Sequence, residues 1–169
     1  GGLGDGGMVV TNNLQLADRL RQYRNLGRDR DGRCVDIGYN SRLDEIQAAF
    51  LEIKLGSLDE DNEDRIANAS YYDTALNADA FVKPSEVAEG EHVYSHYTVR
   101  HSKRDDVLKF LRERMIESMV YYPLPLHLEP CFAYQGYQKG HFPVAEQLCS
   151  DVLSLPVSPG LTRRELEQV

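Results

Sequence analysis

The chain lacks the features that mark several classes of protein. It has only three cysteines, Cys34, Cys131 and Cys149, which are widely separated and form no CxxC pair. This spacing gives no sign of a zinc site, and free thiols in a reducing cytoplasm are the simplest interpretation, with a disulfide as the alternative. No apolar run approaches the roughly 18 residues that a membrane span needs. The opening GGLGDGG has neither the basic start nor the apolar stretch of a signal peptide, so we expect a cytoplasmic protein.

Basic residues are also in short supply. Lysine and arginine number 19 against 27 aspartates and glutamates, which gives a net charge of -8. Proteins that bind nucleic acid or membrane surfaces need basic patches, so we expect neither partner. The 169 residues are 41% hydrophobic, enough to build a core in one sizeable domain or two small ones. No methionine opens the chain and Gly1 lies within a glycine-rich turn, so we expect a piece cut from a longer protein.

The first forty residues combine turn-forming and helical patterns. A short strand is expected over residues 8–10, after the glycine-rich turn. Asn12 or Asn13 can then cap a helix that runs to about Arg24, because apolar residues recur there with helical spacing. Residues 25–39 are charged and contain several glycines, which indicates a loop.

A long helical pattern follows over roughly residues 42–76. At a rise of 1.5 Å per residue, such a helix would span about 50 Å. One small domain does not cover that length, so we expect the helix to cross between domains or to line a subunit interface. Gly56 and the acidic run 59–61 could bend or interrupt it.

The second half of the chain predicts further strands and helices. Alternation over residues 92–99 predicts a strand. The prolines of residues 122–130 exclude a regular helix or a central strand there, which leaves a loop. The other expected elements are a helix capped by Ser102 and Asp105, a strand near 117–120 that completes a β-α-β unit, a helix from Pro143 to about Val152, an edge strand over 153–157, and a last helix capped by Thr162 and Glu165. The fold class is therefore α/β.

Two places could bind an anion or a substrate. Just before the long helix, Asn40 offers amide donors and Arg42 a planar fork suited to carboxylate or phosphate. In the alternative, Asn40 or Ser41 caps the helix and Arg42 is an ordinary surface residue. Tyr121, Tyr122 and His127 lie in the proline-rich loop, and loops of this kind often place side chains in a site, although a lone histidine there is usually structural. The glycine-rich turn at 4–7 fits neither the P-loop nor the dinucleotide fingerprint, and a simple tight turn is favoured.

Four segments, taken together and in order, resemble one family. The sequence GGLGDGGMVVTN resembles the turn that follows the cofactor lysine in the DegT/DnrJ/EryC1/StrS aminotransferases, which depend on pyridoxal 5'-phosphate and act on nucleotide sugars. IGYNSRLDEIQAA is similar to the helix-entry signature of that family, and VYYPLPLHLEPCF to its substrate loop. FPVAE with LSLP matches its C-terminal pattern. The four matches cover nearly the whole chain.

The resemblance implies the fold-type I architecture of the aspartate aminotransferase-like enzymes. Residues 1–40 would end the large cofactor-binding domain, 41–84 would form a helical region between domains or at the interface, and 85–169 would form the small C-terminal α/β domain. Enzymes of the family are homodimers with active sites shared between subunits. The Schiff-base lysine is expected just upstream of Gly1, outside this chain, and none of the lysines present is in its position.

The resemblance also implies roles for individual residues. Asn40 matches the asparagine that reaches the cofactor phosphate of the other subunit. Arg42, Tyr121, Tyr122 and His127 match positions at the nucleotide-sugar site, and Tyr121 stands where the family usually has histidine. The implied reaction transfers an amino group, from glutamate, to a keto sugar of a UDP- or dTDP-linked hexose, in the biosynthesis of polysaccharide or antibiotic sugars. The alternatives are a sugar dehydratase of the same family, with histidine in place of the lysine, and a non-catalytic chain for dimerisation or nucleotide-sugar binding.

Overall fold

The computed structural model describes residues 2–85 and 90–169 and divides into two compact units, Gly1–Leu58 and Asp59–Val169. Each unit is described by itself. The boundary between the two units falls inside residues 41–84, the helical region that we expected between two domains. The division into three parts, 1–40, 41–84 and 85–169, stays a prediction. Across the described residues, no helix has both the length and the apolar character needed to cross a bilayer.

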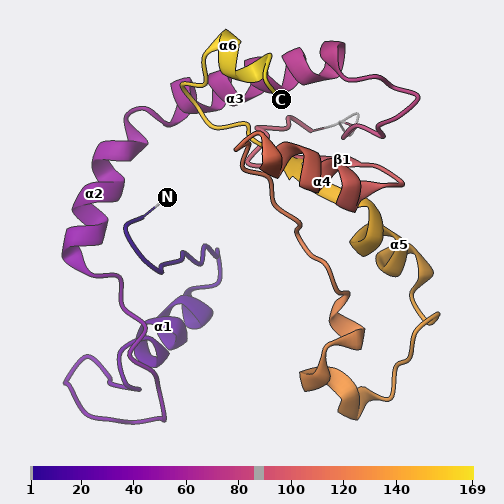
Figure 1. Ribbon diagram of the computed structural model, residues 1–169. Coiled ribbons are helices and arrows are strands. Elements are labelled where there is room, and N and C mark those ends of the chain that lie inside the picture. The colour runs from indigo at the N-terminus through magenta and orange to yellow at the C-terminus, as the bar shows by residue number, and fades with distance from the viewer. Residues whose placement is uncertain (1, 86–89) are drawn as a thin grey trace. The chain divides into compact units, whose positions relative to one another are not determined.

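The first unit contains two helices, α1 (Leu14–Tyr23) and α2 (Glu45–Leu55) (Figure 1). Asn13 caps α1, because its Oδ1 accepts a hydrogen bond from the backbone N–H of Leu16 at 3.1 Å. This confirms the predicted cap. The strand predicted over residues 8–10 is wrong: these three apolar residues are 70–87% exposed and have no ladder partner among the described residues. A strand is stable only beside a hydrogen-bonded neighbour.

The single long helix predicted over 42–76 is also wrong in its extent. It is two helices, α2 and α3 (Leu58–Ala75), and α2 begins at Glu45 rather than near Arg42. The predicted interruption at Gly56 is confirmed, since Gly56 ends α2 and the next helix starts two residues later. The acidic run 59–61 lies in the first turn of α3, where carboxylates interact favourably with the positive end of the helix dipole.

The second unit contains an antiparallel pair of strands, β1 (Tyr97–Arg100) and β2 (Val152–Leu155), with Tyr97 opposite Leu155. Met119 bridges Ser154 on the free edge of β2, through Met119 N to Ser154 O at 3.2 Å and Ser154 N to Met119 O at 2.7 Å. All four residues of β2 are buried. In this two-stranded sheet β2 is an edge strand, as predicted for 153–157, although it spans Val152–Leu155 and its outer edge is covered at one residue by Met119. The strand predicted over 92–99 is shorter in the structure, where β1 begins at Tyr97, and the strand predicted near 117–120 is reduced to the single bridge at Met119.

The remaining elements of the second unit are short. Pro143 occupies the first turn of its helix and Thr162 forms a capping box with Glu165, as predicted. Ser102 makes no cap, because the residue before helix α4 (Arg104–Glu113) is Lys103, which makes no side-chain capping bond. The proline-rich loop contains two 3-10 turns. These elements are α4 (Arg104–Glu113), η1 (Leu126–Leu128), η2 (Pro130–Gln135), α5 (Pro143–Asp151) and α6 (Arg163–Leu166).

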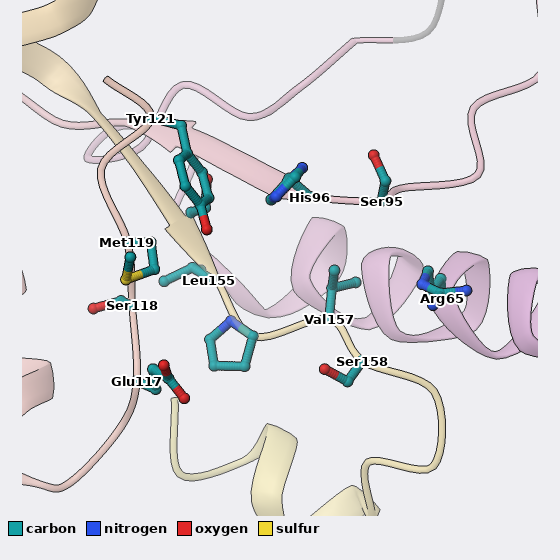
Figure 2. A pocket seen from close by; sticks show the side chains of 12 residues that line it. Arg65, Ser95, His96, Glu117, Ser118, Met119, Tyr121, Leu155, Val157 and Ser158 are labelled. Carbon is teal, nitrogen blue, oxygen red and sulfur yellow. The ribbon is translucent and has the colours of Figure 1, made fainter. Parts of the chain in front are cut away.

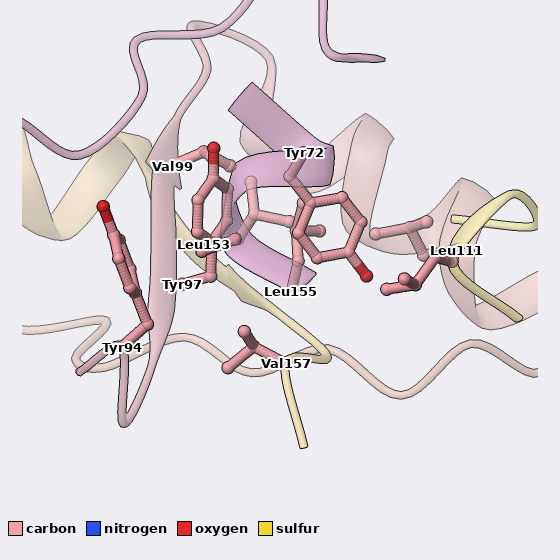
Figure 3. Close-up of a cluster of buried hydrophobic side chains, with 10 residues drawn as sticks. Tyr72, Tyr94, Tyr97, Val99, Leu111, Leu153, Leu155 and Val157 are labelled. Carbon is pink, nitrogen blue, oxygen red and sulfur yellow. The ribbon is translucent and has the colours of Figure 1, made fainter. Parts of the chain in front are cut away.

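Aromatic and aliphatic side chains from α3, α4 and the two strands form the core of the second unit (Figure 3). Tyr72 and Tyr97 are almost fully buried, with ring centroids 5.1 Å apart. Each phenol has a partner: Tyr97 donates to Asp73 Oδ1 at 2.6 Å, and Tyr72 donates to the backbone oxygen of Pro156 at 2.8 Å. Burial raises the pKa of Tyr72 to about 12, so its hydroxyl remains a hydrogen-bond donor at neutral pH.

The segment after β2 runs antiparallel to α3 and is tied to it by three hydrogen bonds. Tyr72 binds Pro156 O, Asn68 donates to Ser158 O at 3.0 Å, and Asp64 accepts from Gly160 N at 3.2 Å. Four helical residues rise about 6 Å and two extended residues about 6.6 Å. The two spacings match closely enough for every fourth side chain of one helix face to reach every second residue of an extended chain. We call this set the α3 ladder.

Removing the tyrosine hydroxyl from the α3 ladder should destabilise the second unit. Tyr72→Phe leaves Pro156 O without its partner, and we expect a loss of about 1–3 kcal/mol, seen as a fall of several degrees in the thermal unfolding midpoint. Tyr137→Phe, which removes the same group from a side chain 45% exposed, is the matched control and should change the midpoint little. Equal midpoints for the two variants would contradict the ladder's contribution.

Candidate functional site

The loop before α2 is held by a close approach of two glycines. Gly27 has φ +71, and a Cβ on Gly38 would overlap the backbone nitrogen of Gly27 and lie 2.7 Å from the backbone oxygen of Tyr23. Only glycine lets two backbone segments come this close. Tyr39 N donates to Tyr23 O at 2.7 Å, which brings the end of the loop against the end of α1.

Asn40 and Arg42 lie together at the end of this loop. Asn40 pairs with Asn25 in an isolated antiparallel bridge, so its backbone position is fixed while its side chain is exposed. Its Oδ1 accepts a hydrogen bond from Arg42 Nε at 3.1 Å, and Arg42 Nη1 lies 3.5 Å from Asn25 Oδ1. The alternative that makes Asn40 or Ser41 a helix cap does not hold, because α2 begins at Glu45 and its N-cap residue is Asp44.

This arrangement leaves donors directed to solvent. The amide oxygen of Asn40 is used by Arg42, so its N–H₂ group and the other N–H groups of the exposed guanidinium are the atoms open to a ligand. Adjacent amide and guanidinium donors suit the oxygens of a phosphate. The residues present therefore fit an anionic group such as a cofactor phosphate. Over the described parts of the chain, no group of three His, Cys, Asp or Glu side chains is placed to hold a metal ion.

Tyr121 and Tyr122 lie together in the second unit. Their ring centroids are 5.4 Å apart, and Tyr121 also makes an edge contact with His96 at 4.8 Å. Tyr121 is 39% exposed and Tyr122 is 70% exposed. Both rings thus remain available to a ligand.

Tyr121 lines a cavity of about 260 Å³ in the second unit (Figure 2). Hydroxyl and charged groups line it together with the segment after β2, and they include Arg65, His96, Glu117 and Ser118. Arg65 comes from α3, where its Nη1 donates to the backbone oxygen of Asp61 at 3.0 Å. No local pattern in the sequence predicts that these residues lie together, because they come from segments that are far apart along the chain.

His127 makes its contacts with residues other than the two tyrosines. Its Nε2 is 3.1 Å from Glu146 Oε1, and its ring packs against Phe142 with centroids 4.8 Å apart. The side chain of His127 is only 8% exposed. Its principal partner is thus a carboxylate of α5. The sequence motifs assign no role to Glu146, although a carboxylate in the first turn of a helix is favoured there by the helix dipole.

Glu146 gathers several donors besides His127. Its carboxylate accepts from Gly140 N at 2.7 and 3.0 Å and from Phe142 N at 3.3 Å. Burial acts to raise the pKa of this carboxyl, but the hydrogen bonds from Gly140, Phe142 and His127 outweigh it and lower the pKa. The stabilisation that this gives is therefore present above the usual carboxyl pKa and is lost as the pH falls through the lowered value.

Comparison with known proteins gives a consistent result. A sequence profile of the DegT/DnrJ/EryC1/StrS aminotransferase family matches residues 2–169. The chain is 44% identical to a protein of Geobacillus stearothermophilus named pleiotropic regulatory protein, over 100% of this chain and 46% of that one. It is 40% identical to the dTDP-3-amino-3,6-dideoxy-alpha-D-galactopyranose transaminase of Aneurinibacillus thermoaerophilus, over 97% and 45%. The chain thus spans about half the length of the curated relatives it matches.

The fold has the same relatives. The crystal structure of S. venezuelae DesV in complex with a ketimine intermediate matches with a TM-score of 0.88 and 37% identity, over 94% of this chain and 43% of that one. A DegT DnrJ EryC1 StrS aminotransferase from Brucella abortus matches with a TM-score of 0.84 and 37% identity, over 94% and 42%. These likenesses confirm the α/β fold-type I architecture implied by the sequence motifs.

The glycine contact predicts a large effect of one methyl group. Gly38→Ala forces the loop away from α1, and we expect a loss of about 1–3 kcal/mol with a lower thermal midpoint. Gly56→Ala is the control, because Gly56 has an ordinary helical conformation and its added Cβ meets Ile53 O at 3.4 Å. That variant should be neutral or slightly stabilising. A Gly38→Ala protein as stable as Gly56→Ala would contradict the close approach.

Proposed function

Because the chain belongs to the DegT/DnrJ/EryC1/StrS aminotransferase family over residues 2–169, we propose that the full-length protein transfers an amino group to a keto sugar of a nucleotide-linked hexose. The observation that carries the proposal in this chain is the exposed pair Asn40 and Arg42, whose free donors suit phosphate oxygens. Pyridoxal 5'-phosphate, when bound, supplies the exchange of amine and carbonyl and the electron sink that transamination needs.

Asn40 is the residue that we assign to the cofactor. Its amide N–H₂ would donate to the cofactor phosphate bound in the second subunit of a homodimer. The hydrogen bond from Arg42 Nε to the amide oxygen of Asn40 supports this role, because it leaves the N–H₂ group of the amide as the end that faces solvent. The bridge to Asn25 fixes the backbone from which the side chain extends.

Arg42, Tyr121 and Tyr122 are the residues that we assign to the nucleotide sugar. Arg42 keeps N–H groups for a second anion, such as the diphosphate of a sugar nucleotide. The exposed tyrosines offer ring faces to a base or sugar and hydroxyls to its oxygens. Direct contact of His127 with the substrate stays a prediction, and its bond to Glu146 suggests a different contribution.

The finer parts of the proposal concern the substrates. The relatives of this chain include a dTDP-sugar transaminase and a UDP-N-acetyl-3-dehydro-alpha-D-glucosamine 3-aminotransferase of Acidithiobacillus ferrooxidans, the latter 38% identical to this chain. We propose a UDP- or dTDP-linked acceptor and glutamate as the amino donor. The upstream lysine, outside this chain, would hold the cofactor.

The reaction can be tested directly in the full-length protein. Incubated with glutamate and a set of UDP- and dTDP-linked keto sugars, it should form 2-oxoglutarate and an amino sugar nucleotide in equal amounts, followed by mass spectrometry. Loss of water from the sugar without 2-oxoglutarate would instead indicate the dehydratase reaction. Binding of the nucleotide sugar with neither product would indicate the non-catalytic alternative.

The role of Asn40 can be tested by a change of charge. Asn40→Asp replaces the donor with a carboxylate that repels phosphate, and loss of a charge-assisted hydrogen bond of about 1.5–3 kcal/mol should raise the cofactor dissociation constant about 10- to 100-fold. Titration of the apo-protein, followed by cofactor absorbance, measures this. Asn62→Asp adds the same charge on α3 and keeps its contact with Arg65. Equal affinities in the two variants would rule out the phosphate contact.

A further inference from the structure

The two tyrosines of the proposed site are poorly fixed by their own packing. Tyr122 is 70% exposed and Tyr121 is 39% exposed, and the ring contacts of Tyr121 are with His96, itself exposed, and with Tyr122. Where packing does not fix a side chain, the backbone that carries it sets which rotamers and positions it can take. The orientation of both rings must therefore depend on the contacts at the two ends of their segment.

The first end is fixed in the sheet. Met119 exchanges two backbone hydrogen bonds with Ser154 in the buried strand β2. Thr98 on β1 adds a side-chain hydrogen bond to Ser154 at 2.8 Å, which holds that residue from the other side. The chain therefore leaves the sheet at a defined point, just before Tyr121.

The second end is fixed by His127 and Glu146. The two side chains are 8% and 15% exposed and lie 3.1 Å apart. Phe142, which packs on the His127 ring, donates its backbone N–H to the same carboxylate. Glu146 thus connects the proline-rich loop, the start of α5 and the turn at Gly140 through one group.

Between the two ends the segment has little freedom. Pro123 and Pro125 fix φ at two of its positions. Pro125 is buried, and its backbone oxygen accepts from Leu128 N at 2.9 Å. A movement of His127 is therefore passed along a stiff segment to the tyrosines and is not absorbed by the intervening backbone.

We infer that His127 and Glu146 form a positioning pair, which holds Tyr121 and Tyr122 in the orientation that takes up the nucleotide sugar. The inference rests on the proposed function, and it gives His127 an indirect role in place of direct contact with the substrate. Glu146 acts as a carboxylate at neutral pH, since the hydrogen bonds that it accepts keep its pKa below the ordinary value.

The restraint itself can be measured without any activity. His127→Phe keeps a ring against Phe142 and removes the nitrogen, Glu146→Ala removes the carboxylate, and Glu146→Gln keeps one acceptor oxygen. In the full-length protein, hydrogen–deuterium exchange of residues 121–128 should become about tenfold faster in the first two variants and less so in the third. Exchange in β1 and β2 should not change. Unchanged exchange of 121–128 would overturn the inference.

The consequence for the substrate is measured in the same variants. We expect His127→Phe and Glu146→Ala each to raise the KM for the nucleotide sugar about tenfold, with little change in kcat or in the KM for the amino donor. The double variant should be no worse than either single variant, because the two residues act as one unit. Glu146→Gln should recover part of the loss. Glu113→Ala, an exposed carboxylate on α4, is the control.

The other outcomes separate the explanations. A raised KM in His127→Phe alone would mean direct contact of the histidine with the substrate and would overturn the inference. The inference would also be overturned if the increases in KM of the two single variants multiplied in the double variant. Faster hydrogen exchange of residues 121–128 with an unchanged KM would overturn it as well. If the wild-type protein transfers no amino group, the proposed function fails, while hydrogen exchange still decides whether the pair restrains the segment.

Discussion

The organisation of the second unit depends on one extended segment, β2 and its continuation to Gly160. Every residue of β2 is buried, so each of its backbone polar groups needs a partner inside the protein. β1 supplies partners on one edge and Met119 on the other, and the α3 ladder takes over where the strand ends. The same segment therefore fixes the helix, the sheet and the point at which the tyrosine-bearing loop departs.

The first unit is organised in a different way. Gly27 is the only buried residue among residues 2–58, so side-chain burial cannot define this unit. Backbone hydrogen bonds between the end of α1 and the loop before α2 define it, and the contact of Gly27 with Gly38 allows them to form. The position of Asn40 follows from that backbone geometry, because its own side chain is exposed and is not fixed by packing.

Local features of the fold were predictable from the sequence, and non-local ones were not. Asn13, the Thr162–Glu165 box, Pro143 and the break at Gly56 act over a few residues, so their residue types are sufficient signals. The cover on the outer edge of β2 comes from Met119, a residue far away in sequence, and the four residues VLSL do not reveal which segment will lie beside them. For the site, the family motifs indicated Asn40, Arg42, the two tyrosines and His127. The bonds from Glu146 to the loop come from tertiary packing, and motif order does not contain them.

The candidate binding residues of the first unit and those of the second unit share a physical requirement. A side chain that binds a ligand through its donors or ring faces must keep those groups free of other partners, and this prevents it from being fixed by its own burial. Its position must then come from neighbours that make no contact with the ligand. In the first unit the neighbours are glycines that let two backbone segments meet, and in the second they are a buried strand and the His127–Glu146 contact. Because the supporting residues are separate from the binding ones, ligand affinity and folding stability should respond to different substitutions. When a supporting residue is changed, the loss of ligand affinity should increase with the mobility that the binding side chain gains.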